Sequence, residues 1–202
     1  GPGRPPMTMS ELVRRTRSTR HFREDRCVSR EVLEHLVDLG RLAACEGNRQ
    51  ALKYGLSHRR ETNERIFDLL GWAALLPDWP GPARGERPAA YVVVLGDLGI
   101  GKSFGYDAGL AAQSILLGAA EAGLGACIVG TVDRDRLRRR FGLPDRFEIL
   151  LVIALGEPGE RVEIETVGGD GDTRYWRDDE GIHHVPKRRL EDVLVELPDP
   201  AP

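Results

Sequence analysis

The amino-acid sequence predicts an α+β protein in which a small sheet is covered by helices. Two apolar runs, "AYVVVLGD" at 90–97 and "EILLVIALGE" at 148–157, have the length and composition of buried strands. The longest helical segment, 107–124, lies between them. The predicted order is helices, strand, helix, short strand, helix, strand and an irregular tail, which is typical of an α+β fold.

The chain before residue 90 is predicted to form three helices and one short strand. A short basic helix is expected from Met9 to Arg17, and a strand at "LKYGLS", 52–57. A third helix is expected from about Glu61 to Leu76, before a proline-rich loop. The second helix lies within 27–45, where Ser29 can cap the first turn and residues recur at helical spacing at Leu33, Leu36, Val37 and Gly40.

After residue 97 the prediction continues with the long helix. Segment 107–124 has Ala and Gly on most of its helical faces, and such a helix can pack closely against neighbours on several sides. "ACIVG" at 126–130 follows, and then a basic helix from about Arg134 to Phe141, capped by Asp133 and closed by Gly142. The tail is expected to be irregular, with "RVEIET" at 161–166, a turn near Gly181 and a last helical segment at 187–197.

Composition places the chain among ordinary globular proteins. Of its 202 residues, 41% are hydrophobic and 30% are charged. The formal net charge of −3 offers no global attraction to nucleic acid or to an acidic membrane. No apolar run approaches the roughly 20 residues that span a bilayer. The widely spaced Cys27, Cys45 and Cys127 indicate neither a disulfide framework nor a zinc site, and a reducing cytoplasm is expected.

The octapeptide "GDLGIGKS" at 96–103 matches the phosphate-binding pattern G-x-x-x-x-G-K-S and follows a predicted strand. A P-loop protein usually has a second strand that ends in an aspartate for the metal ion. Here Glu157 follows a glycine at the end of the comparable run, and three predicted helices precede the supposed first strand. We therefore expect a glycine-rich turn with Lys102 in solvent, and keep a P-loop nucleotide-binding enzyme as a remote alternative.

Three polar segments supply candidate ligands for a phosphorylated cofactor. "RTRSTRHF" at 15–22 has three arginines close to hydroxyl residues, and guanidinium groups hold phosphate through forked contacts. "AACEGNRQ" at 43–50 places two amide side chains on a turn that ends a helix, and "VPKRRLED" at 185–192 adds cations. Together with "DAGLAAQSILLGAAEAGLGACIVG", these segments resemble the FMN-dependent nitroreductase family over most of the chain, from about Leu12 to about Asp192.

The resemblance implies which residues of this chain bind FMN. An N-terminal element contacts the phosphate, the ribityl chain and the ring edge, and an asparagine bonds the pyrimidine side of the isoalloxazine. A backbone N–H faces flavin N5, and a K-x-R pair closes on the phosphate. In that order, the matching residues are Arg17, Ser18 and Arg20; Asn48, with Gln50 beside it; Val129 and Gly130; and Lys187 and Arg189.

The resemblance also implies a nitroreductase-like fold with a small mixed or antiparallel sheet, in an intertwined homodimer. Residues 9–202 would form one FMN-binding domain, after a disordered leader or tag remnant at 1–8. The implied activity transfers hydride or electrons from NAD(P)H through FMN to a small organic acceptor, without a metal ion. No acid–base side chain is singled out, because the cofactor carries the hydride chemistry.

Alternatives and departures accompany this interpretation. A flavin-dependent dehydrogenase, a specialised reductase of another substrate class and a flavin-binding protein without turnover stay open. Thr16 stands where many family members have another arginine, and Ala44 and Cys45 replace a Pro-Ser pair before the asparagine. Cys45 has two interpretations, a redox-sensitive thiol beside the ring or a small half-buried residue.

Overall fold

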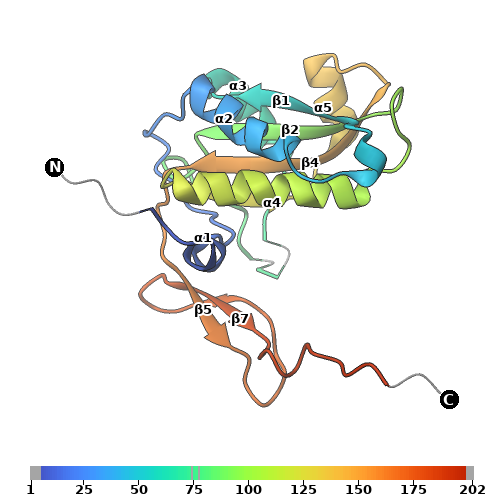
Figure 1. The fold of residues 1–202 in the computed structure, drawn as a ribbon. Coiled ribbons are helices and arrows are strands. Elements are labelled where there is room, and N and C mark those ends of the chain that lie inside the picture. The colour runs from blue at the N-terminus through green and yellow to red at the C-terminus, as the bar shows by residue number, and fades with distance from the viewer. Residues whose placement is uncertain (1–5, 74, 77, 199–202) are drawn as a thin grey trace. The chain divides into compact units, whose positions relative to one another are not determined.

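The computed structural model describes residues 6–73, 75–76 and 78–198, and Figure 1 shows its fold. The chain divides into two compact units, Gly1–Glu160 and Arg161–Pro202, which are described separately. Most of the predicted leader falls on residues 1–5, which lie outside the described residues. A single FMN-binding domain over 9–202 stays a prediction.

A four-stranded antiparallel sheet forms the centre of the first unit. The strand order is β1-β2-β4-β3, and each neighbouring pair is antiparallel. The two central strands are the apolar runs from which the fold class is predicted, and all of β2 is buried. The α+β prediction is therefore confirmed, with strands β1 Leu52–Ser57, β2 Ala90–Asp97, β3 Gly125–Val129 and β4 Phe147–Gly156.

Helices cover both faces of this sheet (Figure 1). Successive side chains of a strand point to opposite faces, so Val92 and Val94 pack with α2 and α4, whereas Val93 and Leu95 pack with α3 and α5. The first unit therefore has two apolar cores, one on each side of the sheet. Its helices are α1 Met9–Arg15, α2 Arg30–Arg41, α3 Arg60–Phe67, α4 Gly105–Glu121 and α5 Arg134–Phe141, with a 3₁₀ turn, η1, at Glu46–Asn48.

Helix ends follow the predicted caps where the signal is local. The Ser29 hydroxyl accepts the Val32 N–H at 3.3 Å, and Asp133 accepts the Arg136 N–H at 3.0 Å. Gly142 closes α5 in the left-handed conformation, with φ of 60°. The prediction that the third helix continues to Leu76 is wrong. Helix α3 ends at Phe67 because the next residues bond to the chain after β3, with the Gly71 N–H donating to the Thr131 carbonyl at 2.8 Å.

The second unit forms a three-stranded sheet where the sequence predicts an irregular tail. Strand β5 (Val162–Thr166) runs parallel to β7 (His183–Lys187), and β6 (Trp176–Arg177) runs antiparallel to β7. The predicted turn at Gly181 is present, with φ of 79°. The helix predicted over 187–197 is wrong, since Lys187 belongs to β7 and the residues after it form turns and irregular structure. The apolar residues of this segment are exposed: Leu190, Val193, Leu194, Val195 and Leu197.

Candidate functional site

The arginine-rich segment 15–22 lies along β3 at the edge of the sheet. Ser18 forms an isolated parallel bridge with Ala126, and the Thr19 N–H donates to the Ala126 carbonyl at 3.0 Å. Gly125 permits this approach, because a Cβ there would lie 2.6 Å from the Thr19 hydroxyl oxygen. The segment is therefore fixed to the strand that ends at the predicted N5-facing backbone.

Arg17 has donor capacity that the described protein does not use. Its Nη2 donates to the Val13 carbonyl at 2.8 Å, while its buried Nε has no hydrogen-bond partner within the described residues. Burial lowers the pKa of the Arg17 guanidinium, although an arginine stays charged at neutral pH. A buried polar group without a partner costs about 1–3 kcal/mol, so an acceptor supplied by a ligand would remove that cost.

Arg20 lies in a different environment from Arg17. The Glu160 carboxylate accepts hydrogen bonds from the backbone N–H groups of Arg20 and His21. Arg20 also lies near the buried Cys127 thiol, whose pKa is raised by burial, while Arg20 and a hydrogen bond with Ser18 act in the opposite direction. Because the buried Nε of Arg17 has no partner among the described residues, whereas a carboxylate already lies against the backbone of Arg20, Arg17 is the stronger candidate for binding an anion.

Asn48 and Gln50 lie on and just after η1, the turn that follows α2. Both side chains are exposed, and both residues have left-handed backbones, with φ of 51° and 52°. The Gln50 amide donates to the Asn48 side-chain oxygen at 3.3 Å. A left-handed backbone at a non-glycine residue costs roughly 1–2 kcal/mol, so this turn depends on its contacts with the rest of the protein.

A buried carboxylate of α4 holds this turn. Asp107 is 5% exposed, and its Oδ1 accepts the Glu46 N–H at 2.8 Å. Sequence analysis treats Asp107 only as the start of a helix and misses this contact. The signal that could have found it is a single acidic residue at the head of a helix otherwise rich in Ala and Gly.

Cys45 lies beside the same carboxylate. It is half-buried and lines a cavity of about 170 Å³ together with Gln50, Tyr54 and Asp107. The pKa of the Tyr54 hydroxyl is raised by burial and by the neighbouring Asp107 and Cys45. This position is that of a small half-buried residue, although it is close to Gln50 of the candidate site.

The backbone at the end of β3 is held in place. Val129 is buried and Gly130 is exposed. Arg134 donates through Nη2 to the Gly130 carbonyl at 3.2 Å and through Nε to the Ile149 carbonyl at 2.8 Å. A Cβ on Gly130 would meet no atom within 4 Å of the described structure. A planar ligand could therefore approach this backbone closely.

Lys187 and Arg189 belong to the second unit. Lys187 is the exposed last residue of β7, and its carbonyl accepts the Val167 N–H at 3.0 Å. Arg189 is exposed and pairs with Glu191 at 3.6 Å. Their role at the phosphate stays a prediction.

The octapeptide 96–103 forms a turn that is bonded to itself. The Asp97 side chain accepts the Gly99 N–H at 3.0 Å, and the Asp97 carbonyl accepts the N–H groups of Ile100 and Gly101. Lys102 is exposed, and α4 begins only at Gly105. Three backbone donors that a P-loop would direct at phosphate are used within the turn, so this geometry does not support a P-loop.

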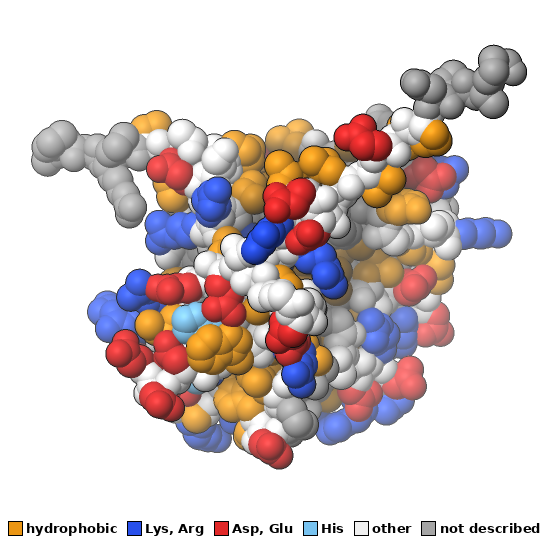
Figure 2. Space-filling model, turned by 90° about the horizontal axis from the view of Figure 1, so that it is seen from below, with side chains coloured by type: hydrophobic (Ala, Val, Ile, Leu, Met, Phe, Trp, Pro, Cys, Tyr) orange, Lys and Arg blue, Asp and Glu red, His pale blue; other side chains and the backbone are white. Residues whose placement is uncertain are grey.

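Charge is mixed over the surface. Figure 2 shows Lys and Arg side chains interspersed with Asp and Glu on the face it presents. Arg138, within a run of three arginines, donates to the carbonyls of Pro144 and Phe147 at 2.6 and 2.7 Å. Within the described ranges, no group of three His, Cys, Asp or Glu side chains could hold a metal ion, and each helix is too short or too polar to cross a bilayer.

Comparison with known proteins gives concordant matches. A family model described as the nitroreductase family matches residues 13–100 and 102–157. A protein of Methanothermobacter thermautotrophicus, provisionally named NADH dehydrogenase/NAD(P)H nitroreductase, is 28% identical over 161 residues, which are 76% of this chain and 79% of that protein.

Solved structures share the fold. A nitroreductase family protein from Clostridium difficile 630 is 24% identical, with a TM-score of 0.63 over 76% of this chain and 86% of that chain. A provisionally named nitroreductase in complex with FMN, from Desulfovibrio desulfuricans, is 21% identical, with a TM-score of 0.68 over 98% of this chain and 99% of that chain. At these identities the likeness concerns the fold, since one fold hosts many functions.

Proposed function

The chain belongs to the nitroreductase family, and from this premise we propose that it is an FMN-dependent oxidoreductase with NAD(P)H as donor and a small organic molecule as acceptor. When bound, FMN supplies the hydride chemistry. The side chains of this protein then have to bind the cofactor, orient its ring and leave room for a substrate beside it.

The observation that carries the proposal is the buried Nε of Arg17, which has no hydrogen-bond partner in the part of the chain that the structure describes. The guanidinium is held on one side by the Val13 carbonyl and keeps an N–H for an outside acceptor. A phosphate oxygen is a suitable acceptor, because arginine presents its donors in a fork that matches the oxygens of phosphate. The residues present therefore fit the phosphate end of FMN.

The other elements fit the ring end. The Asn48 and Gln50 amides each offer a donor and an acceptor, as the pyrimidine edge of an isoalloxazine requires. Asp107 holds the turn that carries them. The exposed Gly130, without a Cβ, allows a ring to lie close to the end of β3. Lys187 and Arg189 are proposed as additional phosphate ligands from the second unit.

We also propose that the protein is a homodimer in the cytoplasm, and helix α4 supports the dimer. One side of α4 packs into the core, whereas Tyr106 is 86% and Leu110 is 47% exposed on the other. Leu98 and Ile100, just before the helix, are also nearly half exposed. Tyr106 and Leu110 are neighbours on the helix by their i, i+4 spacing, and exposed apolar surface of this kind marks an interaction site. Light scattering at micromolar concentration should show a dimer, and a stable folded monomer would contradict this part of the proposal.

Titration of the apoprotein with FMN and with riboflavin tests the cofactor assignment. Riboflavin has the same ring without the phosphate. A charge-assisted hydrogen bond contributes about 1.5–3 kcal/mol, so Arg17→Ala should weaken FMN by about tenfold to a hundredfold and riboflavin far less. Asn48→Ala should weaken both flavins, because its proposed contact is with the ring.

Arg14→Ala is the matched control, because Arg14 is an exposed arginine on the adjoining helix α1. It removes the same charge and should leave both affinities near those of the wild type. If Arg17→Ala weakens FMN and riboflavin equally, the phosphate is not bound by Arg17. If neither flavin binds the wild-type protein, the proposed function itself is wrong.

A further inference from the structure

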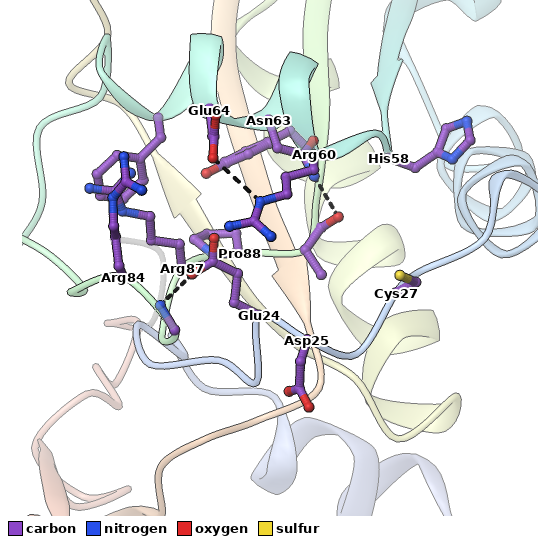
Figure 3. Close-up of a pocket in the computed structure, with 14 residues that line it drawn as sticks. Glu24, Asp25, Cys27, His58, Arg60, Asn63, Glu64, Arg84, Arg87 and Pro88 are labelled. Atoms are coloured by element: carbon purple, nitrogen blue, oxygen red, sulfur yellow. Dashed lines mark hydrogen bonds and ion pairs between the residues drawn. The ribbon is translucent and has the colours of Figure 1, made fainter.

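A second cavity, of about 320 Å³, opens beside α3 at the start of β2 (Figure 3). Its wall includes the apolar Phe67, Pro88 and Ala89, and the hydroxyl-bearing Tyr91. The residues that line it include none of those proposed to bind FMN. Its volume is at the lower end of the roughly 300–1,000 Å³ found for small-molecule sites.

Tyr91 brings an unsatisfied hydroxyl to this wall. The residue is 0% exposed, and its hydroxyl has no hydrogen-bond partner in the described part of the chain. Burial raises the pKa of Tyr91 above its ordinary range, so the hydroxyl keeps its proton and can donate. Phenylalanine would fill the same space without an unpartnered oxygen. The hydroxyl is therefore a donor at this wall that an acceptor on a ligand could use.

Arg87 brings a second unused donor. Its Cζ lies 4.0 Å from the centroid of the Phe67 ring, and its buried Nε has no acceptor among the described residues. Over those residues, neither Arg87 nor Arg84 forms an ion pair with a carboxylate. Both donors thus belong to groups that line one cavity, and one of them carries a positive charge.

The carboxylates of the wall limit the charge of a ligand. Glu64 pairs with Arg60 at 3.4 Å, and Glu24 accepts the Gly85 N–H at 2.5 Å. Figure 3 shows Asp25 pointing away from Arg84 and Arg87. The two nearer carboxylates are occupied, but they would repel a dianion more than a monoanion. A single negative charge attached to an apolar body therefore fits this wall better than a phosphate.

We propose that this cavity binds a small organic carboxylate of about the size of benzoate. Its carboxylate accepts hydrogen bonds from Arg87 and Tyr91, and its apolar body packs against Phe67 and Pro88. The site is separate from the flavin elements, and the proposal does not depend on FMN chemistry.

Isothermal titration calorimetry of the purified, flavin-loaded protein tests the proposal, with benzoate as the probe and benzamide as its neutral counterpart. Benzoate should bind and benzamide should bind at least tenfold more weakly, because only benzoate carries a charge that pairs with Arg87 and a second acceptor oxygen. Arg87→Gln should weaken benzoate by about tenfold to a hundredfold. Arg139→Gln, which removes an exposed arginine of α5, should leave benzoate affinity unchanged.

Tyr91→Phe separates binding from folding. Because the hydroxyl has no partner among the described residues, this variant should resist denaturant at least as well as the wild type without benzoate. It should also gain less stability than the wild type when benzoate is added. Unchanged benzoate affinity in Arg87→Gln and Tyr91→Phe, equal binding of benzamide, or no binding to the wild type would overturn the proposal.

The visible absorption spectrum of the bound flavin shows whether benzoate binds at the flavin instead of in the proposed cavity. Benzoate in the proposed cavity should leave that spectrum unchanged while heat is released. A spectral shift that saturates together with the heat would place the carboxylate at the flavin and would refute the second site. Neither result affects the assignment of FMN, which is tested by its own titration.

Discussion

Replacing Asp107 should weaken flavin binding through the turn at Glu46–Asn48, which its carboxylate holds. Asp107→Ala removes the acceptor of the Glu46 N–H, a bond of 2.8 Å made by a side chain that is 5% exposed. Hydrogen bonds to charged groups contribute about 1.5–3 kcal/mol. The left-handed backbone of Gln50 costs roughly 1–2 kcal/mol, whereas that of Asn48 costs less because asparagine adopts this conformation more readily. The bond and the strain are therefore of similar size, and without the bond the turn should leave its present conformation.

The expected loss of flavin affinity in Asp107→Ala follows from the fraction of molecules in which the turn keeps its present conformation. A loss of about 1.5–3 kcal/mol lowers the held fraction, and with it the apparent affinity, by about tenfold or more. FMN and riboflavin should weaken by the same factor, because the turn serves the ring and not the phosphate. Asp107→Asn keeps a neutral acceptor, whose bond is worth about 0.5–1.5 kcal/mol, and should lie between the alanine variant and the wild type.

Flavin fluorescence titrations of these variants measure both affinities, and hydrogen exchange at the Glu46 N–H reports the bond itself. Glu121→Ala, at the exposed C-terminal end of α4, is the matched control and should change neither. A folded Asp107→Ala protein with faster exchange at Glu46 but unchanged affinity for both flavins would refute the role of the turn in ring binding. Loss of FMN affinity alone would show that Asp107 acts on the phosphate end.

Two further predictions concern single contacts. Gly125→Ala should weaken FMN binding and lower stability, because the new Cβ would lie 2.6 Å from the Thr19 hydroxyl oxygen and push segment 15–22 off β3. FMN titration and denaturant unfolding measure the two effects. Wild-type values for both would contradict the prediction. In the second unit, the hydrogen bond with Asp178 raises the pKa of His184 and lowers that of Asp178. The contribution of His184 to stability should be complete below its ordinary pKa of 6.5 and be lost as pH rises through the raised value, whereas that of Asp178 should be lost only in acid. NMR titration of the His184 ring should give a midpoint above 6.5 in the wild type and a lower midpoint in Asp178→Asn; equal midpoints would contradict the pair.

Sequence reasoning succeeds where the determining contact is local. The Ser29 and Asp133 caps and the closing Gly142 act within one helical turn, and all three are visible in the sequence. Helix α3 ends early because Gly71 bonds to Thr131, 60 residues along the chain, and no local pattern shows that contact. The second sheet escapes prediction because β5 has no buried residue and β6 has only two residues.

The same distinction holds at the candidate site. The sequence offers Arg17 and Arg20 as equivalent cations, but only the structure shows that Glu160, 140 residues along the chain, accepts the backbone N–H of Arg20 and that the Arg17 Nε has no partner within the described residues. Asp107 serves a turn 61 residues earlier in the chain. Tyr91 is read simply as part of a buried strand, which it is, and only the three-dimensional structure shows that its hydroxyl has no partner within the described residues.

Anaerobic reduction of the FMN-loaded protein with NADH and with NADPH tests the central claim most directly. Purified protein should bind FMN, and at least one of the two nucleotides should bleach the visible absorption of the bound flavin. Dithionite, which reduces flavin without an enzyme site, is the control for a responsive cofactor. Bound FMN that dithionite reduces and neither nucleotide does would contradict the claim that this protein is an NAD(P)H-dependent flavin oxidoreductase.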